Sequence, residues 1–268
     1  MYRRRLRLCC GALAAGLLLA GCSGAEDRGP EGAGSEEADA KGAAPSSPSP
    51  SATGLDFTPD PGRAPDTRAE AERLVRIVGA APVDLGPGYV RRSPYQSEPG
   101  YWPVLDANCV WQREPLPDTA LASLTRYMEL PAEDGKGPIR VAAVVTVHPT
   151  VVDAEWEMAE TLEEALRCPD QQLRQGERIT GLLSQGADFG LMGNFTSEDT
   201  LTEAGEYFSD QLGGPHYYYW VQSRLSQVTV AVVGKGAKGR SDEEVDAALL
   251  QGVSQMLSRA EIELEAQE

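Results

Sequence analysis

The sequence predicts an α+β fold, a mostly antiparallel sheet with helices packed on one face. Residues Ile139–His148 alternate in the manner of a half-buried strand, and His216–Val233 form a long β run with room for a hairpin near Leu225-Ser226. Residues Ser241–Leu257 have the pattern of a capped amphipathic helix. Strands joined by hairpins, and helices that return to the same sheet, favour antiparallel neighbours.

Three helices are expected, each with its own boundary signals. Pro65-Asp66-Thr67 opens the first and Gly79 ends it, the second runs from Val151 to Arg167 before Cys168-Pro169, and Ser241-x-x-Glu244 is a capping box for the third. The predicted buried positions are Ala71, Leu74, Val75 and Val78, then Ala154, Met158, Leu162, Ala165 and Leu166, then Val245, Ala248, Leu249, Gly252, Val253, Met256 and Leu257. The glutamates expected to face water are Glu155, Glu157, Glu160, Glu163 and Glu164.

The strands are expected mainly in the second half of the chain. In Ile139–His148 one face should carry Val141, Ala143, Val145 and Val147, and the other Arg140, Ala142, Val144 and Thr146. Further strands are predicted at Asn108–Glu114, Arg178–Ser184 and Leu201–Phe208, and Val228, Val230 and Val232 should point inward. Pro82–Pro103 is rich in proline and glycine with a turn at 84–88, and Leu121–Leu130 fits either helix or strand.

The amino terminus has the pattern of a lipidated export signal. Four arginines at positions 3, 4, 5 and 7 precede an apolar run from Leu8 to Ala20, and Leu19-Ala20-Gly21-Cys22 follows. A run of about 13 apolar residues is too short for a membrane span of roughly 20. The run also fits an ordinary secretory signal, but Cys22 directly after two small residues resembles the lipobox of bacterial lipoproteins. The resemblance implies cleavage before Cys22, a diacylglycerol on its thiol, and a place on the outer face of the cytoplasmic membrane.

Composition divides the chain into three parts. Residues 1–21 are the predicted signal peptide, and 22–64 are the lipidated cysteine and a disordered tether, rich in Gly, Ala, Ser, Pro and Glu. Residues 65–268 have the size of one domain with a real core.

The charge is strongly acidic. Four of the 24 basic residues lie in the signal, which leaves 20 against 41 acidic residues and a net charge of −21 on the mature chain. Nucleic-acid binding needs a basic patch that releases counterions, so we expect no nucleic-acid partner. The alternative is that the acidic residues have no partner and serve only as solvated surface.

The cysteines leave one pair for the folded domain. Cys9 and Cys10 lie in the signal and Cys22 takes the lipid, so Cys109 and Cys168 remain in an oxidising compartment. We predict a disulfide between them. Free thiols or a metal site are the alternatives, and neither cysteine has a second Cys or a His at metal-motif spacing.

Several of these features together resemble one family. They are the opening helix, the Asp84-Leu85-Gly86-Pro87-Gly88 turn, Cys109 on an early strand, Cys168 just past the central helix, the Arg224–Val230 strand and the closing helix. The chain is similar here to the PknH-like extracellular sensor domain of actinobacterial receptor kinases, over about residues 66–260. The resemblance implies an antiparallel sheet with helices and a cleft that binds an extracellular ligand. That family has two disulfides, whereas these two cysteines make one.

No catalytic motif is present. Neither His148 nor His216 has an H-x-x-x-H or H-E-x-x-H setting, and both are interpreted as surface or strand-end histidines. No G-x-S-x-G occurs. Gly234-Lys235-Gly236 lacks the rest of a phosphate-binding loop and is expected to link a strand to a helix. We predict no cofactor, no metal and no catalytic residue.

One aromatic run is a candidate binding surface. On a strand, Tyr217 and Tyr219 share one face, and Tyr218 and Trp220 share the other. One pair could join the core while the other lines a groove, where aromatics with polar tips suit ligands. The alternative is that both pairs belong to the core.

Three classes of function remain after these exclusions. The first is a membrane-anchored, non-enzymatic sensing or binding module facing the cell wall, with a small molecule or an envelope protein as partner. The second is a structural or assembly lipoprotein that docks another envelope protein. The third, a cell-envelope hydrolase, lacks a nucleophile and base in the sequence.

Overall fold

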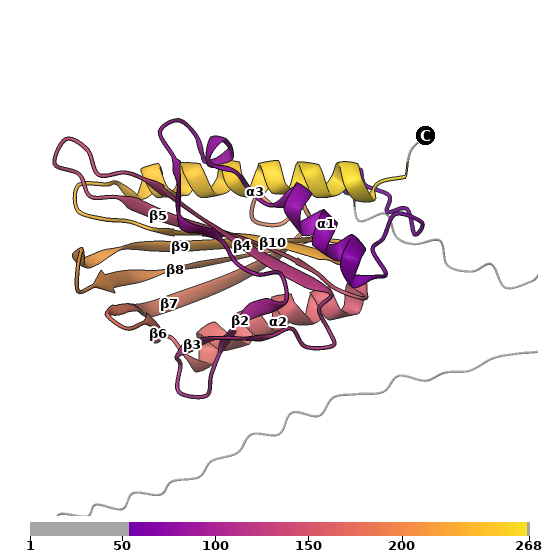
Figure 1. Ribbon diagram of the computed structural model, residues 1–268, viewed down its shortest axis with the longest axis horizontal. Coiled ribbons are helices and arrows are strands. Elements are labelled where there is room, and N and C mark those ends of the chain that lie inside the picture. The colour runs from indigo at the N-terminus through magenta and orange to yellow at the C-terminus, as the bar shows by residue number, and fades with distance from the viewer. Residues whose placement is uncertain (1–53, 267–268) are drawn as a thin grey trace, which may run out of the picture. The chain divides into compact units, whose positions relative to one another are not determined.

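The computed structural model describes residues 54–266 (Figure 1). The signal peptide, Cys22 and most of the tether lie outside the described residues, so those predictions stay predictions. No helix of residues 54–266 is both long and apolar enough to cross a bilayer.

Eight strands form one antiparallel sheet in the order β1-β4-β5-β10-β9-β8-β7-β6. A separate antiparallel hairpin consists of β2 (Tyr101–Leu105) and β3 (Trp111–Pro115). The strands of the large sheet are β1 (Val90–Gln96), β4 (Ala122–Leu130), β5 (Ile139–Val147), β6 (Gln171–Arg174), β7 (Glu177–Asp188), β8 (Asp199–Ser209), β9 (Gly213–Leu225) and β10 (Val228–Lys235).

The helices occupy both faces of this sheet. Helices α1 (Arg68–Val78) and α3 (Asp242–Leu264) lie on one face, while α2 (Val151–Arg167) and the β2–β3 hairpin lie on the other (Figure 1). The predicted α+β class with an antiparallel sheet is confirmed. We expected all helices on one face of the sheet. Helices α1 and α3 do share a face, whereas α2 packs on the opposite one.

The main core fills the space between the sheet and the two helices α1 and α3. The predicted inward residues of β10 are buried there, and so is one alternate set of β5. Gly234 lets α3 approach the sheet, because a Cβ at that position would lie 2.5 Å from Val245 Cγ1. The buried residues that define this face on the two strands are Val141, Ala143, Val145, Val147, Val228, Val230 and Val232.

The helix boundaries follow from local sequence. The side chains of Thr67, Thr150 and Ser241 each accept a hydrogen bond from a first-turn backbone N–H, as good N-caps do. All predicted buried positions of α1 and α3 are buried. On α2 the prediction holds for Ala154, Met158 and Ala165, but Leu162 is only half-buried and Leu166 is 78% exposed.

The amino-terminal half contains more strand than predicted. The Pro/Gly-rich passage holds a short 3-10 helix (Pro82–Leu85) and two strands, β1 and β2, and the ambiguous segment 121–130 is β4. Cys109 lies in the turn before β3 with a φ of 61°, rather than in the strand. Strands β1 and β2 were missed because they contain proline, which has no backbone N–H to donate to a neighbouring strand. An edge strand or a hairpin strand tolerates that loss, because part of its backbone is not paired.

The packed chain also begins earlier than residue 65. Leu55 and Phe57 contact the main core. The backbone N–H of Asp60 donates to Leu264 O at 2.8 Å, and Pro59 bridges to Glu265. The predicted boundary therefore falls inside the packed region, and the end of α3 holds residues assigned to the tether.

The sheet curls strongly toward its α2 side. Arg140 of β5 donates to Glu177 of β7 at 2.9 Å, although β10, β9 and β8 lie between these strands in the sheet. Twist accumulated over several strands produces such curvature. The curl turns one face of the sheet into the concave wall of a groove.

Candidate functional site

A groove lies between the concave face of the sheet and the β2–β3 hairpin. It consists of a larger cavity of about 770 Å³ and a smaller one of about 110 Å³. Both are lined by Pro103, Trp111, Val144, Tyr218 and Trp220, so they adjoin. We refer to the two cavities together as the groove.

The aromatic run divides its side chains between the two faces of the sheet. Tyr217 and Tyr219 face α3: their rings stack with centroids 5.8 Å apart, and Tyr217 Oη donates to Asp246 Oδ1 at 2.9 Å. Tyr218 and Trp220 face the groove. Trp220 Nε1 is buried and has no hydrogen-bond partner among residues 54–266. The sequence left open which pair would line a groove, and the structure places Tyr218 and Trp220 there.

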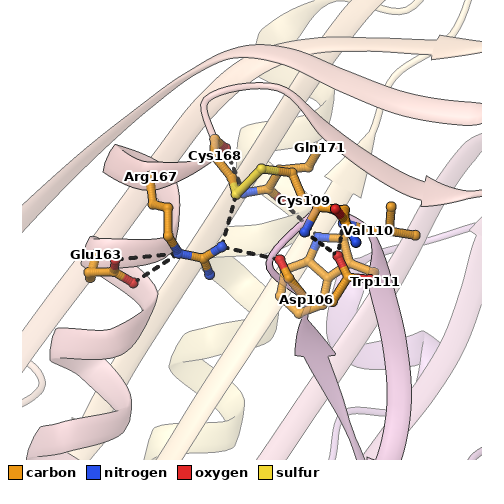
Figure 2. The surroundings of a disulfide bond; sticks show 9 residues. Asp106, Cys109, Val110, Trp111, Glu163, Arg167, Cys168 and Gln171 are labelled. Atoms are coloured by element: carbon orange, nitrogen blue, oxygen red, sulfur yellow. Dashed lines mark hydrogen bonds and ion pairs between the residues drawn. A yellow bond between two sulfur atoms is a disulfide. The ribbon is translucent and has the colours of Figure 1, made fainter.

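The turn of the β2–β3 hairpin is joined to the carboxyl end of α2 by the predicted disulfide. Cys109 and Cys168 are bonded, with their Cα atoms 5.5 Å apart. Figure 2 shows that Trp111 lies beside this bond, and Trp111 Nε1 donates to Gln171 Oε1 at 2.7 Å. The backbone adds a bond from Gln172 N to Cys109 O at 2.8 Å. One covalent link and two hydrogen bonds therefore hold a groove-lining tryptophan in place.

The end of α2 supports the same turn. Arg167 contacts Glu163 on its own helix and donates to Asp106 O at 3.1 Å (Figure 2). Asp106 Oδ1 accepts bonds from the backbone N–H groups of Asn108 and Val110, which closes the turn around Cys109. These backbone hydrogen bonds lower the pKa of Asp106.

One end of the groove is acidic. Burial raises the pKa of Glu164 to about 7, with Glu160 and Glu163 adding to the effect against Arg167. Burial likewise raises the pKa of Glu203 to about 7, and the charge of Glu164 adds to it. The glutamates lining this acidic end are Glu157, Glu160, Glu164 and Glu203. Glu157 and Glu164 were expected to face water, but both are half-buried and line the smaller cavity.

Glu157 forms a small network with His148. The Nε2 atom of His148 lies 2.6 Å from Glu157 Oε2, and Nδ1 lies 2.7 Å from Thr119 O. Burial by itself lowers the pKa of His148, but the hydrogen bond and charge of Glu157 outweigh it and raise the pKa overall. His148 stands at a strand end as predicted, yet its side chain is only 1% exposed, so a surface position is wrong.

The other end of the groove is basic. Five cationic side chains line the larger cavity: Arg113 of the hairpin strand β3, and four from the large sheet, Arg92 of β1, Arg140 of β5, Arg174 of β6 and Lys235 of β10. We call the four residues from the large sheet the basic end. Sequence reasoning missed them, because each is a single charged residue on a strand and gives the same local signal as a solvated one.

Glu177 is the buried counter-charge of the basic end. Its carboxylate accepts from Arg140 at 2.9 Å and from Lys235 at 3.2 Å, and it also contacts Arg174. Burial would raise the pKa of Glu177, but the hydrogen bonds and charges of Arg174 and Lys235 lower it to about 2. Glu177 is therefore ionised at neutral pH.

The groove contains no histidine or cysteine among its described lining residues. Both histidines of the chain lie elsewhere: His148 is bonded as above, and His216 Nε2 lies 2.9 Å from Leu212 O. Among residues 54–266, no three His, Cys, Asp or Glu side chains are arranged to hold a metal ion.

Comparison with known proteins shows a similarity of structure but none of sequence family. No family model and no curated protein matches the chain. The crystal structure of the extracellular domain of PknH from Mycobacterium tuberculosis is similar with a TM-score of 0.41 and 12% sequence identity, over 70% of this chain and 97% of that one. The chain thus has structural similarity to that domain, while membership of the family stays a prediction.

Proposed function

We propose that this protein is a membrane-anchored, extracytoplasmic and non-enzymatic binding module whose ligand occupies the groove. The observation that carries the proposal is the groove itself. Its larger cavity of about 770 Å³ falls in the usual range for small-molecule sites, roughly 300–1,000 Å³. Aromatic walls with a few polar groups are also typical of such sites.

Two features support the extracytoplasmic location. The Cys109–Cys168 bond fits an oxidising compartment. The leader with Cys22 fits export and lipid attachment. The lipid would hold the domain at the outer face of the cytoplasmic membrane, with the tether between them.

The lipid anchor has a direct test. Metabolic labelling with a fatty-acid analogue should mark the parent chain and leave Cys22→Ser unlabelled. Cys10→Ser is the matched control and should be labelled like the parent, because Cys10 lies in the cleaved signal. Equal labelling of the parent and Cys22→Ser would remove the anchor from the proposal.

The groove is tested with a neutral aromatic probe. We expect the full chain carrying Cys22→Ser to bind N-phenyl-1-naphthylamine, measured by fluorescence titration. Trp220→Ala should weaken this binding at least tenfold, because it removes an aromatic wall shared by both cavities.

Trp156→Ala is the matched control for this experiment. Trp156 is on α2, is 63% exposed and does not line the groove, so its removal should leave the affinity within twofold. If Trp220→Ala and Trp156→Ala lose affinity for the dye equally, or if the folded parent chain does not bind it, the groove is not a ligand site.

A docking lipoprotein is the second candidate, and one observation favours it. Four apolar side chains between residues 183 and 195 are exposed by more than half: Leu183, Leu191, Met192 and Phe195. Exposed apolar groups of this kind are common at protein contacts. A photo-crosslinker at Phe195 that captures an envelope protein, with none captured at Trp111, would favour docking over a groove ligand.

A further inference from the structure

The basic end of the groove carries more positive charge than its own carboxylates neutralise. Arg92 pairs with Glu129 at 3.5 Å, while Arg140, Arg174 and Lys235 share the single carboxylate of Glu177. Arg113 and Glu98 also line this cavity. Five cations thus face three carboxylates, a surplus of two positive charges in a chain whose net charge is −17.

Part of this cationic surface has unused hydrogen-bonding capacity. The Nε–H of Arg140 is buried and has no partner among the described residues, and the Arg140 side chain is only 14% exposed. Arg113 donates to the neutral hydroxyl of Tyr127 at 3.0 Å. Arg113 is exposed and its acceptors are neutral oxygens, so an anion seated at this end would be a stronger acceptor for it.

One of these charges, Lys235, is also partly held away from water, with a side chain 21% exposed. Burial lowers the pKa of Lys235, and the nearby Arg174 and Arg92 lower it further against the opposing effect of Glu177. Lysine in such a place is stabilised by an additional negative charge. A ligand anion would therefore bind where the protein itself supplies too few negative charges.

Next to the basic end the groove becomes apolar. The residues that line this part are Leu173, Val144, Val233, Trp111, Tyr218 and Trp220. An inorganic anion alone would leave these apolar walls in contact with water. A molecule with an anionic head and an apolar body would match both parts of the cavity at once.

We propose that the groove binds an anionic amphiphile, a small molecule whose phosphate-, sulfate- or carboxylate-type head lies among Arg92, Arg140, Arg174 and Lys235 and whose ring or chain lies against Trp111, Tyr218 and Trp220. This inference rests on the proposed function and names the ligand class of the same site. Arginine forks bind oxyanions through paired N–H donors, so Arg140 and Arg174 are the expected specificity residues.

The test uses two dyes that share one aromatic body. 1-Anilinonaphthalene-8-sulfonate is N-phenyl-1-naphthylamine with an added sulfonate. Both are titrated into the full chain carrying Cys22→Ser, and we expect the sulfonate dye to bind at least tenfold more tightly. Raising the salt concentration should reduce the difference, because screening weakens partly exposed charge pairs.

Two variants then locate the head group. Arg140→Gln and Arg174→Gln should each weaken the sulfonate dye at least fivefold and leave the neutral dye within twofold. Arg174 is 55% exposed, so its variant keeps the test valid if Arg140→Gln does not fold. Arg178→Gln, an exposed arginine outside the groove lining, is the matched control and should change neither affinity.

The outcomes separate this inference from the proposed function. Equal affinity for both dyes, or equal loss of both in the arginine variants, overturns the anion subsite and leaves the groove as an apolar site. Binding of neither dye to a folded parent chain contradicts the proposed function and this inference with it. Inorganic phosphate that displaces the sulfonate dye but not the neutral one would support the head-group position.

Discussion

Glu177→Gln should lower the free energy of unfolding by about 3–5 kcal/mol, because it leaves buried cations without their shared counter-charge. Glu177 is 5% exposed and bonds Arg140, Arg174 and Lys235 at once. The glutamine side-chain oxygen can still accept hydrogen bonds, but the amide carries no charge and its NH₂ group would face cationic donors. Urea denaturation at pH 7 measures the loss.

The same substitution should change how stability depends on pH. The pKa of Glu177 is about 2 in the folded state and 4.5 as its ordinary value. Because the folded pKa is the lower one, the stabilisation is fully present above the ordinary value and is lost as the pH falls toward 2. That difference in pKa corresponds to about 3 kcal/mol. The difference in the free energy of unfolding between the parent and Glu177→Gln should therefore become smaller as the pH falls from 5 to 3.

Glu206→Gln is the control for this prediction. Glu206 lies on the neighbouring strand β8, is exposed and forms no ion pair among the described residues, so the same chemical change should cost under about 0.5 kcal/mol. A loss below 1 kcal/mol for Glu177→Gln, or a gap that widens in acid, would show that Glu177 does not hold the basic end together.

Removal of the disulfide should be the second large effect. The bond closes a loop with a sequence separation of 59, and its loss through Cys109→Ser and Cys168→Ser should cost roughly 2–4 kcal/mol. For a domain of this size that is a fall in melting temperature on the order of 10 °C. Affinity for N-phenyl-1-naphthylamine should fall too, because Trp111 depends on the Cys109 turn for its place in the groove.

A reducing agent provides the control for the disulfide experiment. It should lower the melting temperature of the parent chain and leave the double variant unchanged, because the sequence has no other cysteine after Cys22. Peptide mapping without reduction should yield a fragment that joins Cys109 to Cys168. Free thiols at both positions, or a parent chain unaffected by reduction, would rule out the bond.

Local signals were enough to predict most of the helices and the clearest strand. The cap at Thr67 and the alternation in Ile139–His148 predicted α1 and β5 nearly to the residue. The capping box at Ser241 predicted the start of α3, but the helix continues to Leu264, past the predicted stripe that ends at Leu257. Each signal lies within one or two turns of helix or a few residues of strand, where backbone sterics and capping hydrogen bonds act. The cysteine pair was also predictable, since elimination left only two for the folded domain.

Which residues meet in the groove depends on contacts between strands that are far apart in the sequence. Arg140 and Lys235 lie 37 and 58 residues from Glu177, and the curl of the sheet brings them to one carboxylate. The same curl makes Tyr218 and Trp220 the groove pair and puts Tyr217 and Tyr219 under α3. A strand's pattern shows that alternate residues face opposite sides, but long-range packing decides which side becomes core and which becomes concave wall.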